Sequence, residues 1–479
     1  MKIELCGHDK RYLVETLALL FFPAAGFSRE VEDGLSARST YEDGVACATV
    51  EAQGVACSAT ERSLPGEEAS GAIARSFYRA GQALTGITPP WGTLTGIRPA
   101  KKVAQLLHRG LTPGQAAERL LQECYTQPEK TALCVEVLAG ERAALDRLNP
   151  AQVSLYISIP FCPTRCSYCS FVSYTVEREG AFIPAYLEAL EQELRQTLSQ
   201  LSALGIGVQT AYMGGGTPTT LTAAQLRSLF GTLAGQLHVP SLLEFTVEAG
   251  RPDTIDADKL QAIREAGANR ISVNTQTTDD ATLARVGRAH TAEQFFAAYA
   301  LARSAGIGQI NVDLIAGLPE EPVEVFARSM REVAALQPEN LTVHALSLKR
   351  AARLQYADMD RSRKGSGDIV EMLQTAGRQA AQGGWRPYYL YRQRNTLGNL
   401  ENVGYAKPGT ECLYNTYIMG EYQSIVAVGA GGVSKVVGLP GGKIERVFHN
   451  KHVRDYIKDD EKRQRNIKTL FSLLKNRYT

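Results

Sequence analysis

The sequence predicts an α/β fold built around a partial, TIM-like barrel of six β/α units. Short apolar segments alternate along the chain with longer segments that carry apolar residues at helical spacing. The expected strands are residues 153–159, 208–213, 242–247, 270–274, 309–315 and 341–346. The expected helices between them are residues 181–201, 223–237, 257–265, 292–305 and 323–336. Strands that alternate with helices of this length form a parallel sheet with right-handed crossovers.

The chain of 479 residues is long enough for several domains, and we expect four parts. The Pro- and Gly-rich turn at 87–100 indicates the first boundary, because such residues interrupt regular elements. The expected parts are a small α/β N-terminal domain (1–92), a helical linker (93–150), the barrel (151–347) and a mixed C-terminal extension (348–479).

Composition and charge restrict the classes of partner. The chain has 52 basic and 50 acidic residues, a balance that gives no reason to expect nucleic acid or an anionic membrane as the main partner. The apolar patch at 17–25 is far shorter than a membrane-spanning helix, so we expect no membrane span. The nine cysteines are an odd number and most are scattered, which is typical of a reducing compartment. We therefore expect a cytoplasmic protein.

Three cysteines follow the first expected strand in close succession. Cys162, Cys166 and Cys169 are separated by three and then two residues. Three thiolates at this spacing can hold an iron–sulfur cluster and leave one iron free for an outside ligand. The alternative is a zinc site with a distant fourth ligand. Structural zinc sites usually combine two close pairs of ligands, and no second pair is visible here.

Because β/α barrels carry their chemistry at the carboxyl ends of the strands, we look for site residues there. The second strand ends in MGGGTPTTL, where Gly215 and Gly216 allow a ligand close to the backbone and Thr217 adds a hydroxyl. An ordinary turn is the alternative for such a glycine run. Glu248 ends the third strand and can accept both ribose hydroxyls of a nucleoside. Asp313 lies within an apolar strand, where a carboxylate is costly without partners, so a functional role is favoured.

Taken together, CPTRCSYC, MGGGTPTTL, ENVGYAKPGTECLYN and VGAGGVSK resemble the radical S-adenosylmethionine (SAM) superfamily. Within it, they are similar to the branch of oxygen-independent coproporphyrinogen III dehydrogenases and their heme-chaperone relatives, HemN and HemW. The resemblance covers residues 153–457, and residues 1–150 look similar to the N-terminal extension of the HemZ-type subgroup. It implies a [4Fe-4S] cluster on the three cysteines and one or two SAM molecules. The cofactor would then supply a 5′-deoxyadenosyl radical after reduction by a donor such as flavodoxin or ferredoxin.

Motif matches to this branch imply which residues contact SAM. The glycine run would hold the SAM amino group, and Tyr168, beside the third cysteine, either packs on the cofactors or is an ordinary packing residue. His344 is either a proton carrier or a hydrogen-bonded core histidine. The implied SAM contacts are Tyr156, Gly215, Gly216, Thr217, Glu248, Gln276, Arg288, Asp313, Ile315 and Ala345.

The resemblance also implies a tetrapyrrole substrate. The leading hypothesis is oxidative decarboxylation of coproporphyrinogen III to protoporphyrinogen IX in heme biosynthesis. The four substrate carboxylates would need contacts with basic side chains. The candidates are Lys349, Arg350, Arg392 and Arg394, and the alternative is that these four side chains are simply hydrated.

Two departures from the branch keep other functions open. Phe171 stands where the dehydrogenases carry a fourth cysteine, and YNTYIM at 414–419 replaces the HNxxYW signature of the chaperones. The alternatives are a heme-binding or heme-transfer protein of the same branch, or a radical SAM enzyme that acts on another tetrapyrrole.

Overall fold

The computed structural model describes most of the chain and divides it into two compact units. Unit 1 consists of Met1–Leu138 with Leu390–Glu401, and unit 2 consists of Ala139–Tyr389 with Asn402–Thr479. The described residues are 1–23, 25–27, 34–96, 98–169, 171, 173–239, 242–347, 352, 354, 366–393, 396, 399–438 and 443–478. Each unit is described by itself below.

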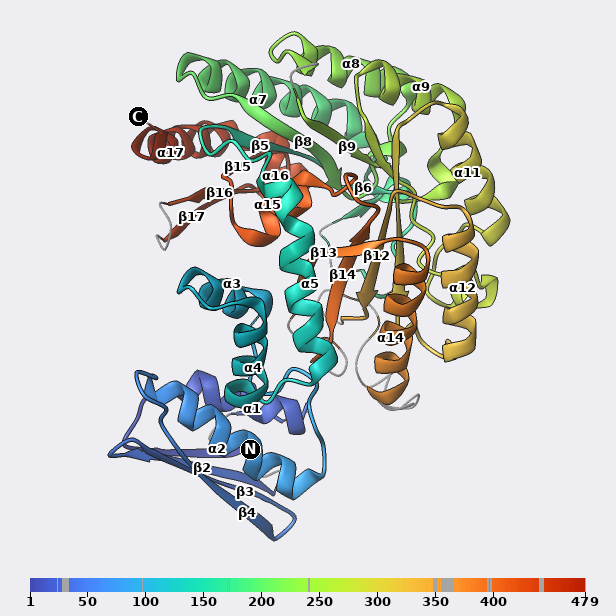
Figure 1. The fold of residues 1–479 in the computed structure, drawn as a ribbon. Coiled ribbons are helices and arrows are strands. Elements are labelled where there is room, and N and C mark those ends of the chain that lie inside the picture. Colours follow the sequence, from blue (N-terminus) through green and yellow to red (C-terminus); the bar gives the residue numbers. More distant parts are fainter. Residues whose placement is uncertain are drawn as a thin grey trace. The chain divides into compact units, whose positions relative to one another are not determined.

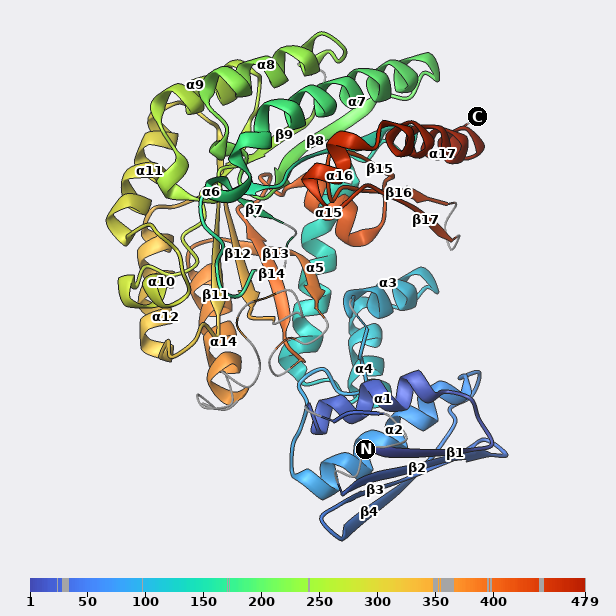
Figure 2. The same cartoon turned by 180° about the vertical axis from the view of Figure 1, so that it is seen from behind.

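Unit 1 contains a four-stranded sheet covered by helices on one face (Figure 2). The strands lie in the order β1 (Lys2–Cys6), β2 (Leu35–Glu42), β3 (Val45–Ala52) and β4 (Val55–Arg62). β1 runs parallel to β2, whereas β2–β3 and β3–β4 are antiparallel hairpins. The hairpin turns use Asp43-Gly44 and Gln53-Gly54, all with positive φ. Turns of this type match the natural twist of a hairpin and favour Gly at the second position.

Helices α1 (Arg11–Phe21) and α2 (Ala69–Thr85) close the core of unit 1. The fully buried side chains between these helices and the sheet include Val14, Leu17, Val50 and Phe77. Three further helices follow, namely α3 (Ala100–His108), α4 (Pro113–Cys124) and α5 (Pro128–Leu145). α4 begins with a capping box in which Thr112 and Gln115 bond to each other's backbone, followed by Pro113 at the first helical position.

Unit 2 is built on six parallel strands, as the sequence predicts (Figure 1). In sheet order they are β5 (Val153–Ile159), β8 (Val208–Gly215), β9 (Glu244–Glu248), β10 (Arg270–Ser272), β11 (Gln309–Ala316) and β12 (Asn340–Ala345). Beyond β12 lie β14 (Glu401–Ala406), which is antiparallel to it, and β13 (Arg386–Arg392). Beyond β5 lie β15 (Ile425–Val428), β16 (Val433–Val437) and β17 (Ile444–Phe448). The six β/α units therefore form a partial barrel extended at both edges, which confirms the predicted fold class.

The two faces of this sheet differ in chemistry. Six helices cover the outer face: α7 (Ile183–Ala203), α8 (Ala223–Ala234), α9 (Ala257–Glu265), α11 (Ala292–Ser304), α12 (Val323–Ala335) and α14 (Ser366–Gln382) (Figure 1). Under them lie apolar residues, for example Ile157, Met213, Val247 and Leu314, all fully buried. The strand register places polar residues side by side on the inner face, in rows such as Tyr156, Tyr212 and Thr246, or Ser272 and Asn311. The inner face is thus suited to a polar ligand.

Two expected elements end earlier than the sequence suggests. The strand expected at 270–274 stops at Ser272, because the chain turns away to reach Gln276, whose φ is +74°. The helix expected at 223–237 stops at Ala234 and is followed by Gly235, which disfavours helix.

The C-terminal part continues with α15 (Leu413–Gly420), α16 (Val453–Lys458) and α17 (Asp460–Tyr478). α17 buries Ile467, Leu470, Phe471 and Leu474 along one side, as an amphipathic helix docked on the sheet extension does. Most of its charged residues are exposed, whereas Arg463 is buried. Among the described helices, none combines the length and apolarity needed to cross a bilayer.

Candidate functional site

The cysteine loop starts at the carboxyl end of β5 and is held by two neighbouring loops. The glycine run after β8 binds it from one side, where Gly216 N donates to Ile159 O at 2.7 Å and Thr217 N donates to Phe161 O at 2.7 Å. On another side, Ser167 N donates to Val286 O at 2.9 Å. The loop is therefore fixed by backbone hydrogen bonds at the edge of the barrel where chemistry is expected.

The three thiols lie close enough to influence one another electrostatically. Cys166 is buried, and Cys162 and Cys169 are partly buried. Burial raises the pKa of the Cys162 and Cys169 thiols, and the neighbouring cysteines raise it further. Metal binding at such a site requires deprotonation, so it releases protons and couples metal affinity to pH.

The polar groups around these thiols suit thiolates. Thr217 Oγ1 donates to Cys162 Sγ at 3.5 Å, and Arg251 Nη1 lies 3.8 Å from Cys166 Sγ. Within the described part of the chain, no three Cys, His, Asp or Glu side chains surround a position for a single metal ion. A cluster places each thiolate on its own iron, so its ligands need not converge on one point. These donors fit the three-thiolate cluster that the sequence predicts.

The glycine run leaves no room for side chains between itself and the cysteine loop. A β-carbon on Gly216 would lie 2.5 Å from Phe161 O and 2.8 Å from Phe161 N, closer than real atoms approach. Gly215 has φ +109°, a conformation that side chains rarely adopt, and lies against Ser158 and Tyr156. Glycine is thus required at both positions for the loops to pack, independently of any ligand.

Glu248 at the end of β9 reaches into the inner face of the barrel beside the glycine run. Its Oε1 accepts from Tyr212 OH at 2.5 Å, and a β-carbon on Gly214 would lie 3.0 Å from its Oε2. Burial raises the pKa of Glu248 to about 7, although the Tyr212 hydrogen bond acts to lower it. A carboxylate here can accept ligand hydroxyls at the edge where the cysteine loop lies.

Three tyrosines form a stack next to Glu248. Tyr212 lies between the other two, with ring centroids 6.2 Å from Tyr156 and 4.6 Å from Tyr414, at interplanar angles of 20° and 26°. Tyr156 comes from β5, Tyr212 from β8 and Tyr414 from α15. Burial raises the pKa of all three phenols, so they stay neutral and act as hydrogen-bonding and packing groups.

Asp313 on β11 belongs to a polar group on the inner face. Asn311 Nδ2 donates to its Oδ1 at 2.7 Å, and His344 Nε2 lies 3.6 Å from its Oδ2. Burial acts to raise the pKa of Asp313, but the interactions with His344 and Asn311 outweigh burial and hold that pKa below its ordinary value. The partners that the sequence argument required for this carboxylate are therefore present. His344 thus contacts Asp313, and its role as a proton carrier stays a prediction.

Gln276 lies one strand away from Asp313 and is tied to β11. Its N–H donates to Asp313 O at 3.0 Å, and its own carbonyl accepts from Ile315 N at 3.0 Å. Its side-chain Oε1 is buried and has no donor among the described residues. A buried amide oxygen without a donor is costly, and a ligand N–H or O–H would satisfy it. Gln276 and Ile315 thus lie together, as the motif match implies.

Arg288 is turned toward the protein in this structure. Its guanidinium donates to Gly250 O at 2.8 Å, to Asn274 O at 2.6 Å and to Tyr168 OH at 3.2 Å. It therefore links the loops after β9 and β10 to the cysteine loop. Its Nε is buried without a described partner. A direct contact between Arg288 and a SAM carboxylate stays a prediction.

Other predicted residues lie further from the cysteine loop or outside the described part. Ala345 at the end of β12 is buried, and its N–H donates to Asn402 Oδ1 at 3.0 Å. Arg392 belongs to unit 1, where its guanidinium donates to Leu94 O and Asn399 Oδ1 and lies over the Trp91 ring. It is 2% exposed, so the alternative that this side chain is simply hydrated is wrong, and its contact with substrate stays a prediction. The other basic candidates, Lys349, Arg350 and Arg394, lie outside the described residues.

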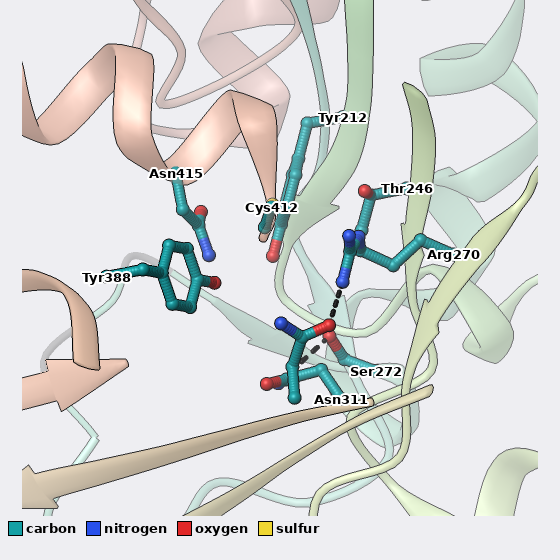
Figure 3. Close-up of a pocket in the computed structure, with 9 residues that line it drawn as sticks. Tyr212, Thr246, Arg270, Ser272, Asn311, Tyr388, Cys412 and Asn415 are labelled. Atoms are coloured by element: carbon teal, nitrogen blue, oxygen red, sulfur yellow. Dashed lines mark hydrogen bonds between the residues drawn. The ribbon is translucent and has the colours of Figure 1, made fainter. Parts of the chain in front are cut away.

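A polar cavity lies on the inner face of the barrel and is lined in part by Tyr212 of the tyrosine stack (Figure 3). The side chains of Tyr212, Arg270, Tyr388 and Asn415 point into the same space from β8, β10, β13 and α15. The remaining lining residues are Thr246, Ser272, Asn311, Asn340 and Cys412. Because Tyr212 also binds Glu248, it connects the cavity to the candidate SAM site.

Two site residues were missed by the sequence reasoning. Tyr212 was read only as part of a strand, and its contact with Glu248 depends on the register between β8 and β9. Arg251 was not singled out as a site residue, yet its guanidinium reaches Cys166. The signal available for Arg251 was its position just after a strand end, in the sequence EAGRPD.

Comparison with known proteins is consistent with this geometry. A family model described as the radical SAM superfamily matches residues 156–333. The fold and the match define the class: this is a radical SAM protein, and that superfamily uses a [4Fe-4S] cluster and SAM.

The relatives narrow the class to a family. The chain is 39% identical over 393 residues to the oxygen-independent coproporphyrinogen-III oxidase-like protein HemZ of Bacillus subtilis, covering 81% of this chain and 78% of that protein. It is 28% identical over 309 residues to the heme chaperone HemW of Escherichia coli (64% and 75%). The solved structure of the coproporphyrinogen III oxidase HemN from Escherichia coli matches with a TM-score of 0.53 and 25% identity (68% and 73%). The chain belongs to the HemN/HemZ/HemW family of coproporphyrinogen oxidase-like radical SAM proteins.

Proposed function

We propose that the chain is a radical SAM enzyme that oxidatively decarboxylates coproporphyrinogen III to protoporphyrinogen IX in heme biosynthesis. The observation that carries the proposal is the cysteine loop, whose thiols meet a hydroxyl donor from Thr217 and a guanidinium from Arg251 at the carboxyl edge of the barrel. Similarity to proteins named coproporphyrinogen oxidase, in Pseudomonas aeruginosa and Escherichia coli, supports the substrate.

In this proposal Cys162, Cys166 and Cys169 hold the [4Fe-4S] cluster, and the inner face binds SAM. The residues proposed to contact SAM are Tyr156, Gly215, Gly216, Thr217, Glu248, Gln276, Arg288, Asp313, Ile315 and Ala345. Bound together, the cofactors supply a 5′-deoxyadenosyl radical that takes hydrogen from a substrate propionate. The chain itself would orient the nucleoside through the Glu248 carboxylate, which binds Tyr212, and through the Gln276 Oε1, which is buried without a donor among the described residues.

The proposal includes an electron donor and a location. A small redox protein of the flavodoxin or ferredoxin class would deliver the electron that starts each turnover. All nine cysteines are free thiols in the structure, as in proteins of a reducing compartment, which supports a cytoplasmic location.

A second candidate function is binding or transfer of heme. Phe171 occupies the position of the fourth cysteine of the dehydrogenases and is 67% exposed, which leaves an apolar ring on the surface beside the cysteine loop. The chain is also 37% identical over 194 residues to the heme chaperone HemW of Bacillus subtilis, covering 40% of this chain and 50% of that protein. A heme-transfer protein would keep the cluster site and use an exposed apolar surface for heme.

Two parallel assays on the reconstituted protein separate the candidates. Anaerobic incubation with SAM, a reductant and coproporphyrinogen III should give a product that has lost two carboxyl groups, detected by mass spectrometry. Unchanged porphyrinogen, together with a saturable spectral change on heme titration, would replace the enzyme proposal by the heme-transfer function.

A further inference from the structure

Arg251 is a buried arginine whose side chain has a fixed orientation. It follows β9 and is 3% exposed. The Asp253 carboxylate binds one edge of its guanidinium. Arg251 Nε lies 3.1 Å from Asp253 Oδ1, and Arg251 Nη2 lies 3.2 Å from Asp253 Oδ2. Such a two-point contact between guanidinium and carboxylate fixes both the plane and the direction of the side chain.

The free edge of this guanidinium faces the cysteine loop. Nη2 donates to Thr164 Oγ1 at 2.9 Å, and Nη1 approaches Thr164 O at 3.4 Å and Cys166 Sγ at 3.8 Å. Thr164 in turn donates to Gly287 O at 3.3 Å. One side chain thus binds the backbone, a hydroxyl and a thiol of the same loop.

The charges around Cys166 are mainly positive. Arg288 also interacts electrostatically with Cys166 while its guanidinium bonds to Tyr168. Asp253 is the carboxylate paired with Arg251. His290 is buried and interacts electrostatically with Arg288, Asp253 and Arg251. Two buried guanidinium groups therefore bring positive charge close to Cys166, and the single carboxylate of Asp253 offsets part of that charge.

We propose that Arg251 is a positioning residue of the iron–sulfur site, which holds the Thr164–Cys166 segment and makes the cluster easier to reduce. This inference rests on the proposed function, because it requires the cysteines to bind a cluster. Hydrogen bonds to ligand sulfurs and nearby positive charge stabilise the reduced, more negative cluster, and so raise its reduction potential. One electron from a low-potential reductant enters the cluster, and no bond is made or broken in that step.

The test compares the reduction potential of wild-type protein with that of Arg251→Gln, Arg251→Lys and Arg264→Gln. Arg264 is an exposed arginine on α9 that donates to Ala305 O, so its replacement changes the charge equally without touching the loop. Each full-length protein is reconstituted anaerobically, iron and sulfide per chain are measured, and the cluster is titrated with dithionite in the absence of SAM. Electron paramagnetic resonance reports the reduced fraction at each potential.

We expect Arg251→Gln to shift the one-electron reduction equilibrium at least tenfold toward the oxidised cluster, or about 59 mV. Arg251→Lys keeps the positive charge but loses the two-point guanidinium geometry, so it should shift the equilibrium less. Arg264→Gln should have the same reduction potential as the wild type. If Arg251→Gln does not fold or retains no iron, the reduction potential of Arg251→Lys is the deciding measurement. A cluster reduction potential of that variant equal to that of the wild type would then overturn the inference.

The outcomes also separate this inference from the proposed function. A wild-type chain that binds no iron and sulfide refutes the proposed function, and the inference with it. A wild-type chain with an intact cluster, and Arg251 variants with unchanged potentials, refutes the inference alone.

Discussion

A buried ion pair attaches the C-terminal extension to the barrel close to the cysteine loop. Glu193 on α7 accepts from His449 Nε2 at 2.8 Å, from Tyr456 OH at 2.5 Å and from Gly429 N at 2.9 Å. The side chains of Glu193 and His449 are 1% and 4% exposed. Gly429 packs so closely on β5 that a β-carbon would lie 2.8 Å from Ser158 O, four residues before Cys162. We predict that His449→Phe, which keeps a ring but removes the ion pair, destabilises unit 2.

The expected magnitude follows from burial. Removing one partner of a buried ion pair costs about 3–5 kcal/mol, because the other charge is left without compensation. Glu193 would keep the donors from Tyr456 and Gly429, so we expect the lower end, about 3 kcal/mol. Unit 2 has about 330 residues and an unfolding entropy of roughly 0.7 kcal/mol per kelvin, so Tm should fall by about 4 °C.

This loss should depend on pH. Burial acts to lower the pKa of His449, but Glu193 outweighs it and raises that pKa above 6.5. The stabilisation from His449 is therefore complete below pH 6.5 and is lost as the pH rises through the folded-state pKa. Burial acts to raise the pKa of Glu193, but His449 outweighs it and holds that pKa below 4.5, so its contribution is complete above pH 4.5. The effect of the substitution should be largest between pH 4.5 and 6.5.

Thermal unfolding of the full-length apo protein, followed by circular dichroism at pH 6 and pH 8.5, measures the effect. The matched control is His452→Phe, since His452 is exposed, lies three residues away and shares a 2.8 Å hydrogen bond with the Tyr174 hydroxyl. The reasoning is refuted if His449→Phe lowers Tm no more than His452→Phe does at pH 6.

Three further substitutions test the site. Cys166→Ala should abolish both cluster absorbance and SAM cleavage, and intact SAM cleavage in that variant would remove the cluster assignment. Burial raises the pKa of Glu248 to about 7. Its ionised carboxylate therefore lowers the free energy of unfolding by roughly 3 kcal/mol above pH 7, whereas it has no such effect below pH 4.5. Glu248→Gln should therefore raise the Tm of the apo protein at pH 8 but not at pH 4.5, and equal changes at both would contradict this. Gly216→Ala forces a β-carbon onto the Phe161 backbone and should lower iron content and Tm, whereas Gly231→Ala, in open space on α8, should leave iron content unchanged.

The parts of the fold that depend on local pattern were predictable from the sequence. Strand and helix alternation gave the six β/α units, and cysteine spacing together with the glycine run marked the edge of the barrel that carries the site. The polar inner face was also encoded, as alternation within strands such as Asn311-Val312-Asp313-Leu314, but the strands were read simply as apolar. Period-two alternation would have separated the ligand side from the helix side.

Contacts between distant segments were not predictable in this way. The Glu193–His449 pair joins residues 256 positions apart, and the Tyr212–Glu248 bond requires the register of two strands. Arg392 shows a related limit, because a basic residue in a Tyr-rich segment offered a hydrated side chain as one alternative, whereas it is buried in unit 1. Charge and motif identify a residue type, but only the tertiary structure decides what that residue faces.

Transfer of hydrogen from the substrate to the 5′-deoxyadenosyl group released from SAM tests the central claim most directly. The reconstituted wild-type protein is incubated anaerobically with SAM, reductant and coproporphyrinogen III deuterated at the propionate β-carbons, and 5′-deoxyadenosine is analysed by mass spectrometry. The account predicts deuterium in the 5′-deoxyadenosine and loss of carboxyl groups from the same substrate molecules. Unlabelled 5′-deoxyadenosine with intact porphyrinogen would contradict it.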